Sequence, residues 1–157
     1  MPRNQTFISG EVAWSEGRFL DCGRMLCKEL SPEEQVRWAT GLLKFCMRYG
    51  PSVPSIERVA ALADAPSDWR FAHAAFSDVR VITLAAEQAD ASVDPLLKSM
   101  LYVAENTAKV IYNASGEPAP FDHDAGWWLV PCFEKFLQAV ARPEVADDGR
   151  RLLFASS

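Results

Sequence analysis

The sequence predicts an all-α fold, an irregular bundle of about six helices that forms a single domain over residues 1–157. Apolar residues recur at helical spacing along most of the chain, and proline and glycine separate these segments. No pair of alternating strands is evident. The length of 157 residues is close to the commonest domain size, at which a fold buries roughly 70% of its unfolded surface. One core is therefore expected.

The first predicted helix covers about residues 10–30. Gly17 and Gly23 lie inside it, and each is expected to cost about 1 kcal/mol relative to alanine in a helix interior. Its apolar positions are Val12, Phe19, Cys22, Leu26 and Leu30.

A second helix is predicted from Ser31 to Tyr49. Ser31 can cap the free backbone N–H groups, Pro32 suits the first helical position, and Glu34 can complete a capping box. The helix should end at Gly50-Pro51. Its apolar face is wide enough to be contacted from two sides, and it also raises the hypothesis of a homodimer. The two stripes of this face are Val36, Ala39, Leu43 and Cys46, and Trp38, Leu42, Phe45 and Tyr49.

Two further helices are expected before residue 90. A short one follows the turn at residues 51–54 and continues to about Ala63. Ser67-Asp68 is expected to cap a longer one that reaches about Gln88. Residues 79–84 are rich in β-branched side chains, so a strand is the alternative there, but the lack of a partner strand favours a helix.

The last third of the chain is predicted to hold two main helices and one long loop. Asp94-Pro95 opens a helix whose apolar residues extend to Ile111. Residues 114–126 contain two prolines and two glycines and are predicted to form the loop. Because proline damages a helix interior, the next helix should start near Pro131 and end at Arg142-Pro143. Residues 126–130 should then be irregular or form a single turn. Residues 150–154 are expected to form a last turn.

Composition and charge exclude several classes of function. The net charge is −5, and residues 51–157 carry nine basic and fifteen acidic side chains, which argues against nucleic-acid binding and favours a basic partner. No apolar run approaches the roughly 20 residues that a membrane helix needs, and residues 1–10 are too polar to be read as a signal peptide. We therefore expect a cytoplasmic protein with reduced cysteines and no cofactor.

The loop residues Asp122-His123-Asp124 are the strongest candidates for chemistry. Carboxylates and an imidazole are ligands for divalent cations, and His73 is the only other histidine that could join them. The simpler interpretation is that Asp122 or Asp124 caps the following turn or helix while His123 faces solvent. A small metal-dependent hydrolase is therefore kept as the alternative function.

The adjacent Trp127 and Trp128 are the strongest candidates for binding. Neighbouring residues on a regular element point in different directions, so one ring can face the core while the other lies at the surface. The simpler interpretation is that both rings anchor the loop to the core. An exposed tryptophan beside acidic residues is typical of a protein interface.

These features favour a protein-interaction module over an enzyme, because no catalytic signature is present. The module would bind a basic protein partner, and a bacterial immunity or antitoxin-like protein that masks a basic toxin is one concrete form. The predicted partner-binding residues are Glu117, Asp122, Asp124, Trp127 and Trp128.

Overall fold

The computed structural model describes residues 3–89, 93–117 and 121–155, and within these ranges the chain forms eight α-helices, one 3₁₀ helix and no strand. The all-α prediction is confirmed, although the helices are more numerous than the six expected. In chain order they are α1 (Arg3–Ser15), α2 (Phe19–Glu29), α3 (Pro32–Tyr49), α4 (Pro54–Leu62), the 3₁₀ helix η1 (Pro66–Phe71), α5 (Ala72–Gln88), α6 (Pro95–Ala114), α7 (Ala125–Val140) and α8 (Pro143–Leu153).

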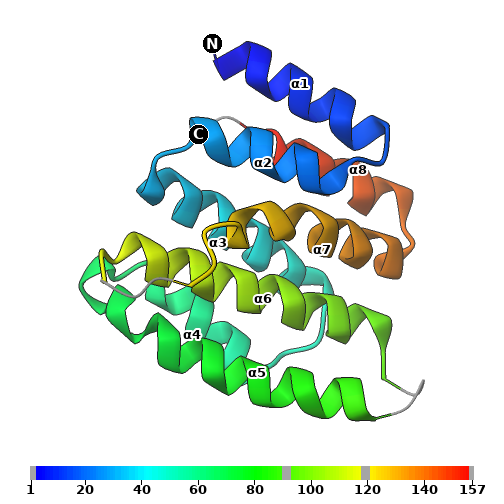
Figure 1. Ribbon diagram of the computed structural model, residues 1–157. Coiled ribbons are helices and arrows are strands. Elements are labelled where there is room, and N and C mark those ends of the chain that lie inside the picture. The colour runs from blue at the N-terminus through cyan, green and yellow to red at the C-terminus, as the bar shows by residue number, and fades with distance from the viewer. Residues whose placement is uncertain (1–2, 90–92, 118–120, 156–157) are drawn as a thin grey trace.

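The helices are stacked from α1 at one end to α5 at the other, with α6 and α7 crossing the middle (Figure 1). Helix α6 packs against α3, α5 and α7, and half of its residues are buried. The rings of Phe45 in α3 and Phe133 in α7 meet edge to face, with centroids 5.5 Å apart. Buried residues of all eight α-helices belong to one hydrophobic cluster, so the fold has a single core.

The predicted helix over residues 10–30 is wrong, because the chain forms two helices that meet at Gly17. This glycine has a φ of +76°, in the left-handed region. Its N–H bonds the carbonyl of Trp14, and the N–H of Arg18 bonds the carbonyl of Ala13, which together form a Schellman motif. Gly17 therefore ends α1 and is not a costly residue inside a longer helix.

Helix α3 begins and ends as predicted. The N–H of Glu34 donates a 3.2 Å hydrogen bond to Oγ of Ser31, and the N–H of Gly50 bonds the carbonyl of Cys46. The wide apolar face contacts α4, α6, α7 and α8 within the same chain. Trp38 belongs to this face, and its indole N–H bonds the carbonyl of Leu153 at 3.1 Å. The face that suggested self-association is thus covered by helices of the same chain.

Residues 79–84 are helical, which settles the choice between helix and strand. The cap expected at Ser67-Asp68 is absent, because the chain first forms the 3₁₀ helix η1 from Pro66 and enters α5 without a side-chain cap. Helix α6 starts as expected, with the side chain of Asp94 accepting a 3.0 Å hydrogen bond from the N–H of Leu96.

The loop after α6 is confirmed over residues 115–117 and 121–124, and residues 118–120 lie outside the described ranges. Helix α7 starts earlier than predicted and contains Pro131. The proline costs α7 one internal bond, the one to the carbonyl of Trp127. Residues 126–130 belong to α7, so the prediction that the helix starts only near Pro131 is wrong. The last turn predicted at residues 150–154 is part of a complete helix, α8, which begins at Pro143.

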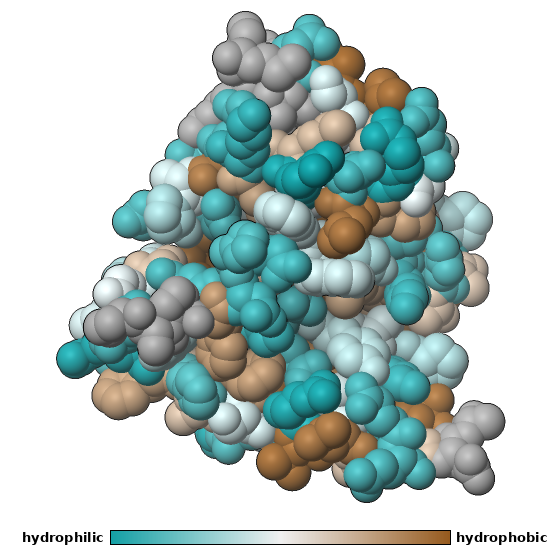
Figure 2. Space-filling view, viewed as in Figure 1, coloured by the Kyte–Doolittle hydropathy of each residue, from teal (hydrophilic) through white to brown (hydrophobic). Residues whose placement is uncertain are grey.

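Polar side chains cover much of the face shown in Figure 2, and apolar ones lie among them near its upper end, in its middle and at its lower end, where α5 lies. Helix α5 exposes Val81 and Leu84. Across the described ranges, no helix combines the length and the apolar character that crossing a bilayer requires.

Candidate functional site

The ring of Phe121 holds the loop between α6 and α7 against the bundle. It stacks on His73 of α5, with centroids 4.9 Å apart and planes 15° from parallel, and it meets Phe76 at 4.8 Å. The backbone N–H of Phe121 also donates a 2.7 Å hydrogen bond to Oδ1 of Asn113, near the end of α6. These contacts fix the position of residues 122–124 relative to α5 and α6.

A cleft of about 600 Å³ opens between α5, α6 and the first turns of α7, beside this loop. The three helices lie one above another in Figure 1, with α7 above α6 and α5 below. Ligand sites in proteins commonly have volumes of about 300–1,000 Å³. The cleft is lined by Phe76, Arg80, Tyr102, Glu105, Asn106, Lys109, Asp122, His123, Asp124, Ala125, Trp128 and Cys132.

A buried carboxylate lies against one wall of this cleft. Glu105 of α6 is only 5% exposed, and its Oε1 accepts a 3.3 Å hydrogen bond from the guanidinium of Arg80. Burial raises the pKa of Glu105, and the positive charges of Arg80 and Lys109 act in the opposite direction. Charged groups this deeply buried are rare unless they are paired, and in a cleft they are typical of functional sites.

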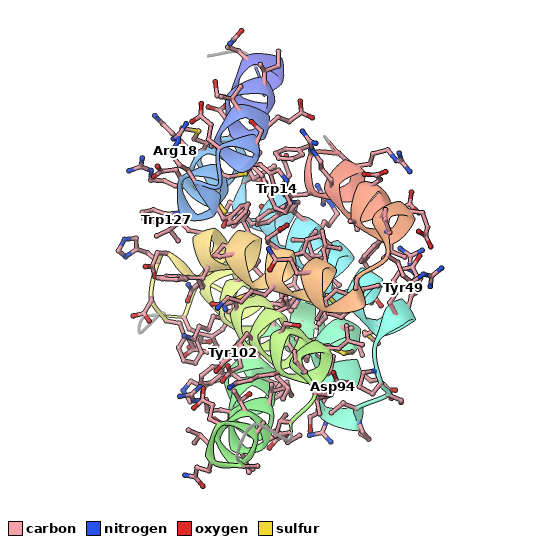
Figure 3. All side chains as sticks on the ribbon, turned by 90° about the vertical axis from the view of Figure 1, so that its right-hand side faces the viewer. Trp14, Arg18, Tyr49, Asp94, Tyr102 and Trp127 are labelled. Carbon is pink, nitrogen blue, oxygen red and sulfur yellow. The ribbon has the colours of Figure 1, made fainter. Side chains whose placement is uncertain are left out.

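Arg80 links Glu105 to a second acidic group at the rim. Its guanidinium lies 3.8 Å from a carboxylate oxygen of Glu87. The same oxygen accepts a 2.5 Å hydrogen bond from the hydroxyl of Tyr102, and this bond, together with partial burial, raises the pKa of Tyr102 to about 12. In Figure 3 Tyr102 lies on α6, between α7 above and α5 below. Arg80, Tyr102 and Glu105, which line the cleft, are thus linked to one another directly or through Glu87.

Lys109 occupies a site of aromatic rings and one carboxylate. Its Nζ lies 5.3 Å from the ring centroid of Phe76 and 5.8 Å from that of Phe121. The same atom is 3.9 Å from Oδ2 of Asp122. A cation is stabilised both by the negative face of an aromatic ring and by a carboxylate, so the cleft holds one cation of its own in this way.

Trp128 and Asp124 form a second pair of aromatic ring and carboxylate. The indole N–H of Trp128 donates a 3.2 Å hydrogen bond to Oδ2 of Asp124, and the residue is 46% exposed. Asp124 is the residue at the start of α7, but its side chain makes no capping bond there. In the part of the chain that the structure describes, no lysine or arginine lies within ion-pair distance of Asp124.

Three of the five predicted partner-binding residues line the cleft. Asp122, Asp124 and Trp128 line the cleft, whereas Trp127 and Glu117 do not. Trp127 is half-buried beside α2 (Figure 3). Its ring meets that of His123 edge to face, with centroids 5.8 Å apart. Trp128, in contrast, is 46% exposed, so the simpler interpretation, that both rings are packed into the core, is wrong for Trp128.

The candidate metal ligands lie near one another but have different partners. Asp122 pairs with Lys109, Asp124 with the indole of Trp128, and His123 with the ring of Trp127. Among the described residues, no three or more His, Cys, Asp or Glu side chains form a group that could hold a metal ion.

His73 and the cysteines do not form a reactive group with the loop residues 122–124. His73 is stacked on Phe121 and is not a lining residue of the cleft. Cys132 lines the cleft, but burial raises the pKa of its thiol to about 11. Burial also raises the pKa of Cys22 to about 12. All four cysteines are free thiols, as predicted.

Sequence reasoning missed the residues that α5 and α6 contribute to the cleft. Glu105 follows Leu101 by four positions and precedes Ala108 by three, so it lies on the apolar side of its helix. A carboxylate at such a position is a usable signal of a buried charge. Arg80 gave no comparable signal, because it lies in the segment whose secondary structure was ambiguous.

The chain is thus a helical bundle with a polar cleft between α5, α6 and α7. Comparisons with models of protein families, with curated proteins and with solved structures gave no significant match.

Proposed function

We propose that this chain is a protein-interaction module that binds a basic protein partner at the mouth of the cleft. The observation that carries the proposal is the exposed ring of Trp128 beside the carboxylate of Asp124. Tryptophan is enriched among the residues that dominate binding energy at interfaces, because a large ring buries much apolar surface and still offers a polar N–H.

The charges of the site support a partner of basic character. The lining residues include three carboxylates, Glu105, Asp122 and Asp124, but only two permanent cations, Arg80 and Lys109. Residues 51–157, from which the whole cleft is built, also carry an excess of acidic side chains. Complementary charge accelerates encounter and selects among partners.

A protein that neutralises a basic toxin is the concrete form of this function that we favour. Such a protein needs a stable scaffold, an acidic surface and an aromatic anchor, and it needs no catalytic group. The small size and the net charge of −5 fit this role.

The proposal is tested by capture followed by reconstitution. Wild-type chain, Asp122→Lys and Trp128→Ala are used as bait, and Asp147→Lys on the exposed surface of α8 serves as the matched charge control. Each captured protein is then purified and titrated against all four baits. We expect a basic partner whose affinity falls about tenfold or more, 1.4 kcal/mol, with each cleft variant and stays near wild type with the control.

The salt dependence of binding provides a second criterion. Attraction between exposed charges is screened as ionic strength rises, so the affinity should fall when salt is added. Folded cleft variants that bind every purified partner as tightly as wild type would show that the cleft is not the interface.

A further inference from the structure

The ammonium group of Lys109 lies in the cleft beside two aromatic rings and one carboxylate. Nζ of Lys109 lies beside the adjacent rings of Phe76 and Phe121, 5.3 Å and 5.8 Å from their centroids, with the carboxylate of Asp122 at 3.9 Å. The side chain of Lys109 is 23% exposed, whereas that of Asp122 is 79% exposed. Aromatic rings together with a carboxylate stabilise a cation in this cleft.

The pair of Trp128 and Asp124 offers the same two elements at the mouth of the cleft. Trp128 is 46% exposed, whereas Lys109 is largely buried. Oδ2 of Asp124 accepts the indole N–H, and within the described ranges Oδ1 accepts no hydrogen bond and no basic side chain pairs with the carboxylate. An aromatic face and an available carboxylate oxygen therefore lie side by side without a cation.

We propose that this pair binds an arginine side chain of the partner, an inference that rests on the proposed function. The guanidinium would lie on the ring of Trp128 and donate to Oδ1 of Asp124. Arginine fits better than lysine, because its planar and weakly hydrated head group stacks on indole while its N–H groups remain directed at a carboxylate.

The basic side chains that line the cleft pair with carboxylates other than Asp124. Arg80 is held by Glu105 at 3.3 Å and by Glu87 at 3.8 Å, and Lys109 is held by Asp122. Each internal cation thus already has a carboxylate partner. The cleft volume of about 600 Å³ leaves room for the arginine stem and for parts of the neighbouring residues.

The test uses the whole chain and three small probes, N-acetyl-arginine amide, N-acetyl-lysine amide and N-acetyl-citrulline amide. Citrulline has nearly the shape of arginine without the charge. Binding is followed at low ionic strength through the ¹H–¹⁵N signals of the indole groups, with the Trp128 signal assigned from Trp128→Phe. We expect the arginine probe to shift the Trp128 signal saturably, and the other two probes to bind at least about fivefold more weakly, about 1 kcal/mol.

Two variants distinguish binding at this site from a general attraction of the probe to an acidic protein. Asp124→Asn keeps an oxygen that can accept a hydrogen bond from the indole but removes the charge. The affinity for the arginine probe should fall at least about fivefold in this variant. Asp147→Asn on α8 removes one exposed carboxylate elsewhere and should leave binding unchanged. Equal binding of the citrulline or lysine probe, or full binding to Asp124→Asn, would overturn the inference.

The failure of this inference is distinguishable from failure of the proposed function. If a purified partner loses affinity for Asp122→Lys and Trp128→Ala while the arginine probe leaves the Trp128 signal unmoved, the cleft is an interface that does not recognise arginine. If the arginine probe binds as expected but every purified partner binds the cleft variants as tightly as wild type, the arginine site is present but the cleft is not the protein interface.

Discussion

Gly23 of α2 lies directly against the carbonyl group of Trp127 in α7. A Cβ atom on Gly23 would be 2.3 Å from that carbonyl oxygen, which is the oxygen whose helical donor is missing because residue 131 is proline. The Cα hydrogen of glycine occupies the place where a larger Cβ group would clash with this carbonyl. A glycine that costs stability in its own helix thus allows a close contact between α2 and α7.

The first prediction concerns this contact. Gly23→Ala should destabilise the fold by about 2 kcal/mol or more, because the clash is with backbone, which cannot turn away. Gly41→Ala is the matched control, since a Cβ there meets nothing within 4 Å and α3 gains helix propensity of about 0.5–1 kcal/mol. Urea unfolding of both variants measures the difference. Equal effects of the two exchanges would show that α2 and α7 are not in close contact.

The second prediction uses the buried carboxylate. Because the pKa of Glu105 is raised in the folded chain, its contribution to the free energy of unfolding is fully present below the unfolded pKa and is lost as pH rises through the folded pKa. Glu105→Gln lacks this dependence. The stability of wild type relative to the variant should therefore decrease between pH 4 and pH 7, as measured by urea unfolding. A difference that is constant with pH would mean that this carboxyl group titrates alike in both states.

The third prediction concerns the thiols. Burial raises the pKa of Cys27 to about 12 and that of Cys132 to about 11, so both are protonated at neutral pH, and only Cys132 is partly exposed. A thiol reagent should modify Cys132 first and the other three cysteines only as the chain opens. Peptide mass mapping of briefly treated native protein measures the order. Denatured protein provides the control in which all four react rapidly, and first modification of Cys22 would contradict the packing of α2.

The fourth prediction concerns metal ions. Zn²⁺, Mn²⁺ and Mg²⁺ should leave the midpoint of thermal unfolding unchanged, because Asp122, His123 and Asp124 have separate partners. A ligand at 100 times its dissociation constant would stabilise the fold by about 2.7 kcal/mol, which calorimetry detects easily. A rise in the midpoint that disappears in His123→Ala would instead support the metal-dependent alternative.

The positions of most helices could be predicted from local sequence, because the signals act over a few residues. Ser31 and Asp94 cap α3 and α6 as expected, since a side-chain oxygen needs only the next turn of backbone. Gly17 and Pro131 were misjudged, because each has two local interpretations. A glycine can end a helix or weaken it, and a proline can start a helix or lie within one when its surroundings compensate.

The sequence alone also determined part of the candidate site. Asp122, Asp124 and Trp128 are within seven residues of one another, so a single loop and one helical turn bring them to the same place whatever the rest of the fold does. It determined the all-α class for the same reason, since apolar spacing specifies a helix before any helix has a neighbour.

Only the tertiary structure decided what completes the site. Arg80 and Glu105 are 25 residues apart, and they pair because α5 and α6 pack with those two positions facing each other. The spacing along a helix fixes which residues share a face, but not which neighbouring helix that face meets. The cleft, its internal cations and the open position beside Trp128 all depend on that packing.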